Sequence, residues 1–158
     1  ETSPSGTLFR MRLNAAEKDA PLTENVAEAE EVRFDKRYRI LVVDDEEEIA
    51  SLLQDILEDH DVEICLRANE ALDRLTNDSF ELVLCDLMMP QMTGMELYDR
   101  CVEQNQSMGS RFVFLTGGAF TEGARAFLER VQQPRLTKPF NQGQLREVVA
   151  GLLADQRA

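Results

Sequence analysis

Five residues that can take part in phosphate chemistry stand at the ends of apolar stretches of this sequence: Asp44, Asp45, Asp86, Thr116 and Lys138. Three carboxylates brought close together repel one another, and the pKa of each rises unless a cation lies among them. Carboxylate oxygens in a small, partly hydrated site favour magnesium (Mg2+). A carboxylate beside bound Mg2+ is a plausible nucleophile toward phosphorus. A lysine ammonium can then neutralise phosphoryl oxygens, and a threonine hydroxyl can donate a hydrogen bond to one of them.

The apolar pattern predicts the strands that position these residues. Continuous apolar runs at 40–43, 82–85 and 112–115 are typical of strands that are buried on both faces. Two shorter strands are predicted, one over Val62, Ile64 and Leu66 and one near Leu136. The carboxyl ends of parallel strands meet at one edge of a sheet, and ligands bind there. We therefore expect the five polar residues to share that edge.

Amphipathic helices are predicted after each strand. The first carries an apolar stripe with steps of three and four residues: Ile49, Leu52, Leu53, Ile56 and Leu57. The last is predicted to begin with Asn141 as N-cap, Gln144 three residues later and Phe140 packed on Leu145. Five strands alternating with five helices predict an α/β fold whose parallel sheet is covered on both faces.

Each polar residue also has an ordinary structural explanation when it is taken alone. Asp45 and the glutamates behind it could simply cap a helix and complement its positive end. Asp86 could be a loop residue, Thr116 a turn residue before two glycines, and Lys138 a solvated lysine. Chance does not readily place all of them at the same edge of one sheet, so we interpret them jointly as one site.

Composition narrows the classes of partner. The 158 residues include 30 acidic and 17 basic ones, and a net charge of −13 argues against binding to nucleic-acid phosphates or anionic lipid. No apolar run approaches the roughly 18 residues that span a bilayer, and no signal peptide is visible. We expect a fragment of a longer cytoplasmic protein that contacts neither nucleic acid nor membrane.

Cysteine and histidine usage excludes some metal sites. Cys65, Cys85 and Cys101 are odd in number and have no ligand-like spacing, which favours a reducing compartment. His60 is the only histidine, so a multi-histidine metal site is excluded. We expect His60 to be a surface or capping residue rather than a phosphodonor.

Four motifs together resemble the receiver domain of two-component signalling proteins. They are Val42–Asp45, Cys85–Pro90 with Gly94, Phe114–Thr116 and Thr137–Phe140. Their order and spacing fit the family, and the resemblance implies a receiver domain over residues 38–156. The resemblance implies a flavodoxin-like, doubly wound (βα)5 sheet with strand order 2-1-3-4-5.

The resemblance also implies a role for each site residue. Asp86 is the implied phosphoacceptor, taking a phosphoryl group from a phosphohistidine and promoting its own phosphorylation before the domain switches conformation. Mg2+ is implied to bind Asp44, Asp45, Asp86 and the backbone carbonyl of Met88. Thr116 and Lys138 are implied to contact the phosphoryl group, and the Lys138–Pro139 bond is implied to be cis. A histidine kinase or histidine phosphotransfer domain is the implied partner, with a homodimer as a further possibility.

The N-terminal residues differ in character. Residues 7–13 alternate in polarity. Residues 1–14 resemble the closing strand of a histidine-kinase ATP-binding domain, and 15–37 read as an acidic linker. This arrangement resembles the C-terminal part of a hybrid histidine kinase. The fragment itself contains no ATP-binding glycine box and no helix with a phosphorylatable histidine.

Two departures from the family pattern bear on function. Arg135 stands where receivers usually carry a switching aromatic residue. Met88 and Gly118 have side chains that cannot orient a water molecule, so we expect the phosphorylated form to hydrolyse slowly. The alternative is a pseudo-receiver that binds partners without phosphate; Arg135 favours it and the intact acid set opposes it. A haloacid-dehalogenase-type phosphatase is excluded, because Met88 occupies the position of its second aspartate.

Overall fold

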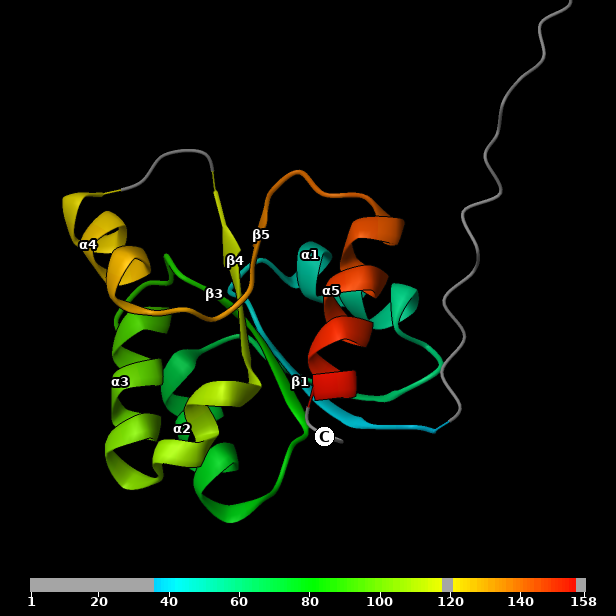
Figure 1. Cartoon of the computed structure of the whole chain (residues 1–158), viewed down its shortest axis with the longest axis horizontal. Coiled ribbons are helices and arrows are strands. Elements are labelled where there is room, and N and C mark those ends of the chain that lie inside the picture. Colours follow the sequence, from blue (N-terminus) through cyan, green and yellow to red (C-terminus); the bar gives the residue numbers. More distant parts are fainter. Residues whose placement is uncertain (1–35, 118–120, 156–158) are drawn as a thin grey trace, which may run out of the picture.

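Five parallel strands form the central sheet, and each is joined to the next by a segment containing a helix (Figure 1). The computed structural model describes residues 36–117 and 121–155. The strand order is β2-β1-β3-β4-β5, which confirms the predicted topology. The strands are β1 (Arg39–Val43), β2 (Asp61–Cys65), β3 (Leu82–Asp86), β4 (Phe112–Thr116) and β5 (Arg135–Thr137).

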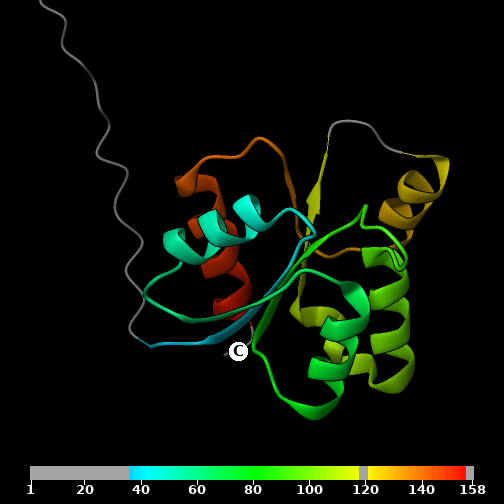
Figure 2. The same ribbon diagram turned by 180° about the vertical axis from the view of Figure 1, so that it is seen from behind.

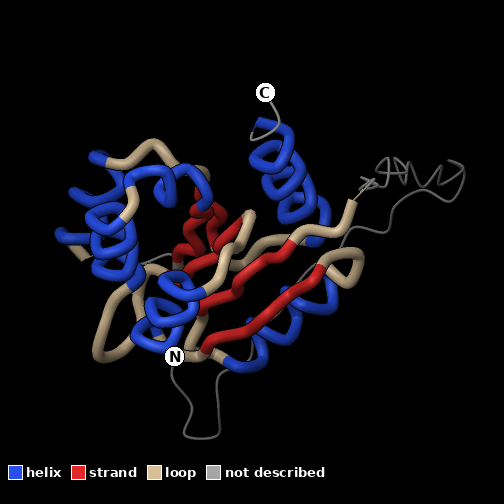
Figure 3. The backbone as a smooth tube through the Cα atoms, turned by 90° about the horizontal axis from the view of Figure 1, so that it is seen from below, coloured by secondary structure: helices blue, strands red, loops and turns tan. Residues whose placement is uncertain are grey.

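Five α-helices cover the sheet in two layers. One layer contains α1 (Glu47–Ile56) and α5 (Gln142–Asp155). The other contains α2 (Ala68–Asn77), α3 (Gly94–Gln104) and α4 (Glu122–Arg130). The view from behind in Figure 2 separates these two groups, and Figure 3 shows the strands running between the helices. A short 3-10 helix, Gln106–Arg111, precedes β4 and was not predicted.

The continuous apolar runs are explained by the helices that cover both faces of the sheet. Alternate residues of each central strand enter one of two hydrophobic cores. On β4, for example, Phe112 and Phe114 pack toward α2, α3 and α4, whereas Val113 and Leu115 pack toward α1 and α5. No polar face is left on such a strand, so its sequence shows no alternation.

The caps and the apolar stripe of the helices follow the prediction with one exception. Asn141 and Gln144 exchange side-chain-to-backbone hydrogen bonds of 2.9 and 3.0 Å at the start of α5, as predicted. In α1, however, Leu52 is 52% exposed. Leu53 and Leu57 are buried as predicted, and Ala50, which was not part of the predicted stripe, is buried with them.

The prediction that His60 is a surface or capping residue was wrong. Its side chain is buried, and its ring meets Tyr38 edge-on at a centroid distance of 5.6 Å. His60 directly precedes β2, and the ring fills the space beside the start of β1. Residues 1–35, which include the predicted strand and most of the linker, lie outside the described residues, as does Gly118. None of the described helices is long and apolar enough to span a membrane.

Candidate functional site

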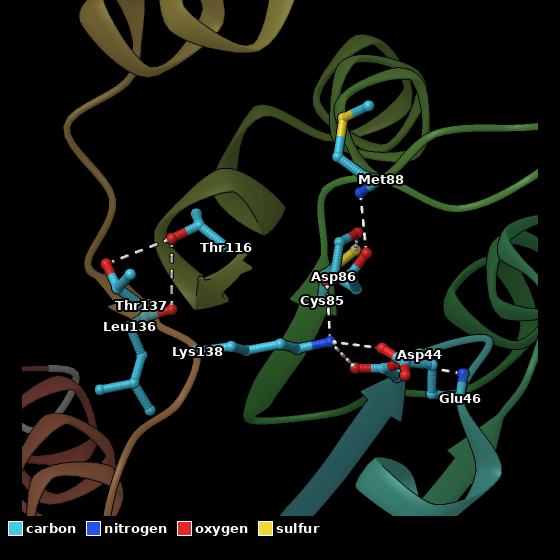
Figure 4. A network of polar contacts seen from close by, with 9 residues as sticks. All are labelled: Asp44, Glu46, Cys85, Asp86, Met88, Thr116, Leu136, Thr137 and Lys138. Atoms are coloured by element: carbon cyan, nitrogen blue, oxygen red, sulfur yellow. Dashed lines mark hydrogen bonds and ion pairs between the residues drawn. The ribbon is translucent and has the colours of Figure 1, made fainter. Parts of the chain in front are cut away.

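The ammonium of Lys138 lies between two carboxylates at the carboxyl edge of the sheet (Figure 4). Its Nζ atom is 2.7 Å from Oδ2 of Asp44 and 3.0 Å from Oδ1 of Asp86. Asp44 directly follows β1, Asp86 ends β3, and Lys138 directly follows β5. Because β4 separates β3 from β5, the long lysine side chain is what allows the third element to reach the other two.

The two carboxylates beside Lys138 are buried, so their negative charges are costly unless a positive charge lies close by. Asp44 is 0% exposed and Asp86 6%. Burial raises the pKa of the Asp44 carboxyl, while the Lys138 ammonium and the backbone N–H of Glu46 act in the opposite direction. Burial alone would lower the pKa of Lys138, but its hydrogen bonds to Asp44 and Asp86 leave that pKa raised. The lysine therefore stays protonated and supplies the positive charge that two buried carboxylates require.

The chain turns sharply after β3 to hold Asp86 in place. The backbone N–H of Met88 donates to Oδ2 of Asp86 at 2.8 Å, and that of Gly94 donates to the Leu87 carbonyl at 3.1 Å. A Cβ atom on Gly94 would lie 2.1 Å from the Asp86 carbonyl oxygen, so no other residue fits there without movement. Gln91, within the turn, has a φ of 70°. The Lys138–Pro139 bond is cis, as the resemblance implied.

The other predicted residues lie around this centre without joining it. Asp45 is exposed, and in the described part of the chain no hydrogen bond or ion pair links it to Asp86 or Lys138. Met88 is 44% exposed at the rim. Thr116 is buried, but its hydroxyl is directed toward β5 rather than toward Asp86 (Figure 4). Among the predicted residues, the side chains of Asp44 and Asp86 are thus in direct contact with that of Lys138, and the backbone N–H of Met88 is bonded to Asp86.

Glu46 is a neighbour of the site that the sequence pattern attributed to helix capping. It does occupy the N-cap of α1, but its side chain makes no capping hydrogen bond. Its carboxylate oxygen lies 3.6 Å from Nζ of Lys138 instead. Its position two residues after Asp44 could have indicated that it lies near the site. It is one of a run of acidic residues, however, and the sequence alone does not distinguish it from the others.

The donor set fits a partly hydrated magnesium ion. Among the described residues, no three His, Cys, Asp or Glu side chains are grouped so that they could hold a metal between them. Mg2+, however, usually keeps several water ligands and binds through one or two carboxylates. Asp44 and Asp86 carry two negative charges against the single positive charge of Lys138, and the exposed carboxylates of Asp45 and Glu46 add to the excess. A divalent cation would neutralise this excess with the hard oxygen donors that it prefers.

Arg135 occupies the position on β5 where the resemblance to receiver domains implied a switching aromatic residue. It lies opposite Phe114 in the register of β4 and β5, and its side chain is exposed. Aromatic rings lie instead between β4 and the helices that cover it. The ring centroid of Phe114 is 5.1 Å from that of Phe127 in α4 and 5.4 Å from that of Tyr98 in α3. In the described residues, α4 is therefore anchored through Phe127 and not through an aromatic side chain on β5.

Comparison with known proteins agrees with this arrangement. Residues 40–150 match the family model of the response regulator receiver domain. The chain is 36% identical over 110 residues to the uncharacterized transcriptional regulatory protein YrkP of Bacillus subtilis, covering 68% of this chain and 46% of that protein. It is 31% identical over 128 residues to the sensor histidine kinase GacS of Pseudomonas protegens, covering 78% of this chain and 14% of that protein. The chain thus spans about half of the length of these relatives or less.

Solved structures show the same likeness. A CheY-like response regulator receiver domain protein from Methanospirillum hungatei is 30% identical, with a TM-score of 0.69; the match covers 77% of this chain and 98% of that one. The chemotaxis protein CheY4 of Vibrio cholerae is 25% identical, with a TM-score of 0.65 and coverage of 74% and 99%.

Proposed function

The chain belongs to the family of response regulator receiver domains, and from this premise we propose that Asp86 accepts a phosphoryl group from a phosphohistidine. The observation that carries the proposal is the contact of one lysine ammonium with both Asp44 and Asp86. In phosphoryl transfer the protein mainly positions groups and balances charge. A nearly buried carboxylate held by an ammonium at the sheet edge is suited to both tasks.

The proposed step assigns each residue a function. An oxygen of Asp86 forms a bond to phosphorus while the bond from phosphorus to the histidine nitrogen breaks, and the imidazole leaves. Lys138 neutralises the oxygens of the transferred group, and Thr116 turns to donate a hydrogen bond to one of them. Asp44, Asp45, Asp86 and the carbonyl of Met88 would hold Mg2+, which supplies further positive charge for the transferred group.

The proposed partner is a histidine kinase or a histidine phosphotransfer domain. Similarity to GacS and the sequence of residues 1–14 support a place at the C-terminal end of a hybrid histidine kinase, with 15–37 as linker and 38–156 as receiver. In that setting the receiver would work in the cytoplasm and pass its conformational change to the parent kinase or to a phosphotransfer protein. The second candidate, a pseudo-receiver that works without phosphate, is favoured only by the exposed Arg135.

Acetyl phosphate tests the proposal directly. Incubation of the protein with acetyl phosphate and MgCl2 should add the mass of one phosphoryl group, and addition of EDTA before the phosphodonor should prevent it. Asp86→Asn should abolish the added mass. Asp73→Asn, a matched change on the exposed surface of α2, should leave it unchanged. Wild-type protein that gains no mass would support the pseudo-receiver instead.

A further inference from the structure

The hydroxyl of Thr116 faces β5 and not the acidic site. Its Oγ1 atom lies 3.3 Å from the hydroxyl of Thr137 and 3.5 Å from the carbonyl oxygen of Leu136. Figure 4 shows the Thr116 and Thr137 side chains pointing at each other, while the Lys138 side chain extends away from them toward Asp44 and Asp86. Among the described residues, no hydrogen bond joins Thr116 to Asp86.

The backbone brings these two threonines together. Thr116 and Thr137 are register partners at the carboxyl ends of β4 and β5. The backbone N–H of Lys138 donates to the Thr116 carbonyl at 2.7 Å and extends this pairing by one residue. Paired residues of neighbouring strands project to the same face of the sheet. Strand register therefore places the two hydroxyl groups within reach of each other.

The Thr116 hydroxyl has only one proton to donate, and this limits what it can bind at one time. A hydroxyl donates one hydrogen bond and has two lone pairs. In its present orientation Thr116 can donate its one proton to the Thr137 hydroxyl or to the Leu136 carbonyl. Donation to a phosphoryl oxygen on Asp86 requires the same single proton, so Thr116 must give up this arrangement before it can act there.

We propose that Thr137 is a positioning residue that holds the Thr116 hydroxyl away from Asp86 in the unphosphorylated protein. The inference rests on the proposed function for its effect on phosphorylation, but not for the resting orientation of Thr116. Loss of the Thr137 hydroxyl removes a contact that must break before Thr116 assists phosphoryl transfer. Phosphorylation should then become faster.

Two substitutions separate the hydroxyl from the shape of the side chain. Thr137 is exposed, so Thr137→Val keeps a β-branched strand residue and removes only the hydrogen bond. Thr137→Ser keeps the hydroxyl and removes the methyl group. The net value of one hydrogen bond predicts that Thr137→Val accelerates phosphorylation by acetyl phosphate about two- to fivefold. Thr137→Ser should react at the wild-type rate. If Thr137→Val instead displaced the neighbouring Lys138, phosphorylation would become slower. A faster or a slower rate therefore distinguishes the proposed role of Thr137 from a general disturbance of the site.

The resting orientation is measured without any phosphodonor. NMR three-bond couplings of the Thr116 side chain should report a single rotamer in the wild type and in Thr137→Ser, and an averaged rotamer in Thr137→Val. Unchanged couplings in Thr137→Val would overturn the proposal, as would changed couplings with an unchanged or reduced rate of phosphorylation. If the wild type takes up no phosphate, the proposed function fails and the couplings alone decide whether Thr137 holds Thr116.

A double-mutant cycle completes the test. In a Thr116→Val background, Thr137→Val should have no further effect on the rate, because the hydroxyl on which Thr137 acts is gone. An acceleration of the same size in that background would show that Thr137 acts by another route and would overturn the proposal.

Discussion

Lys138 and Asp44 are 94 residues apart in the sequence, yet their charged groups lie 2.7 Å apart at the edge of the sheet. The lysine side chain is 16% exposed and that of Asp44 is 0% exposed, so the ion pair is largely withdrawn from water. Removal of one partner of a buried pair leaves an uncompensated charge and is costly. Each charge therefore depends on the other for neutralisation, and both groups take part in the proposed chemistry of the domain.

Lys138→Met should lower the free energy of unfolding by about 3 kcal/mol at neutral pH, because Asp44 and Asp86 lose their counterion. The folded-state pKa of Asp44, already raised by burial, would rise further without the ammonium. A pKa above the unfolded value means that stability is regained as pH falls, so the defect should shrink on acidification. Urea denaturation at several pH values measures this. Lys36→Met, which removes an exposed lysine 3.8 Å from Glu81, should cost less than about 1 kcal/mol. An equal cost for both variants would contradict the prediction.

Gly94→Ala should destabilise the protein by about 1–3 kcal/mol and slow the phosphorylation of Asp86. The added methyl group would meet the Asp86 carbonyl oxygen at 2.1 Å, and backbone atoms cannot move aside as a flexible side chain can. Gly151→Ala in α5 is the matched control, since nothing lies within 4 Å of its added Cβ. It should stabilise the protein by about 0.5–1 kcal/mol through helix propensity. Thermal melts of the two variants that shift in the same direction would refute the close-approach argument.

His60 should make stability fall as the solution becomes acidic. Burial lowers its pKa below 6.5, so the unfolded state binds a proton before the folded state does. The stability due to neutral His60 is fully present above the unfolded pKa and is lost as pH drops through 6.5 toward the folded value. His60→Gln should flatten the pH dependence of the unfolding free energy in that window, even if the variant is less stable throughout. Identical slopes in denaturation curves between about pH 5 and 7.5 would rule this out.

The three cysteines should react slowly with thiol reagents in the native protein. All three are buried and form no disulfide, and burial raises the pKa of Cys65 and of Cys101 to about 11. Few thiolates are present at neutral pH under these conditions. Ellman's reagent should detect them promptly only after denaturation. Fast stoichiometric reaction of the folded protein would show that at least one thiol is accessible.

Phosphate on Asp86 should be lost slowly for a member of this family. The Met88 side chain is 44% exposed beside the site and has no group that orients an attacking water. Met88→Gln adds an amide that can hold a water, so we expect faster loss of phosphate, followed by mass measurement over time. Met92→Gln, a matched change at a partly buried position of the same turn, should not accelerate it. Rapid loss from the wild type would contradict the expectation.

The apolar pattern of the chain was sufficient to predict the layers of the fold. Runs such as 40–43 and 112–115 indicate strands that are buried on both faces, because a strand with one face in water would alternate apolar and polar residues. The positions of Asp44, Asp86 and Lys138 at strand ends then placed them at one edge, since right-handed parallel crossovers bring all carboxyl ends together. Local information determines these features.

Side-chain orientation was decided only by the packed structure. Leu52 was predicted to be buried and His60 to lie at the surface, and both predictions were wrong. The exact rotation of a helix, and which side chain fills the space beside a strand, depend on neighbours that are distant in the sequence. The direction of the Thr116 hydroxyl likewise depends on the register of β4 with β5. Residue types at strand ends thus determined which groups could meet, and the tertiary structure decided which of them touch, because contacts across the sheet are set by register and packing rather than by local sequence.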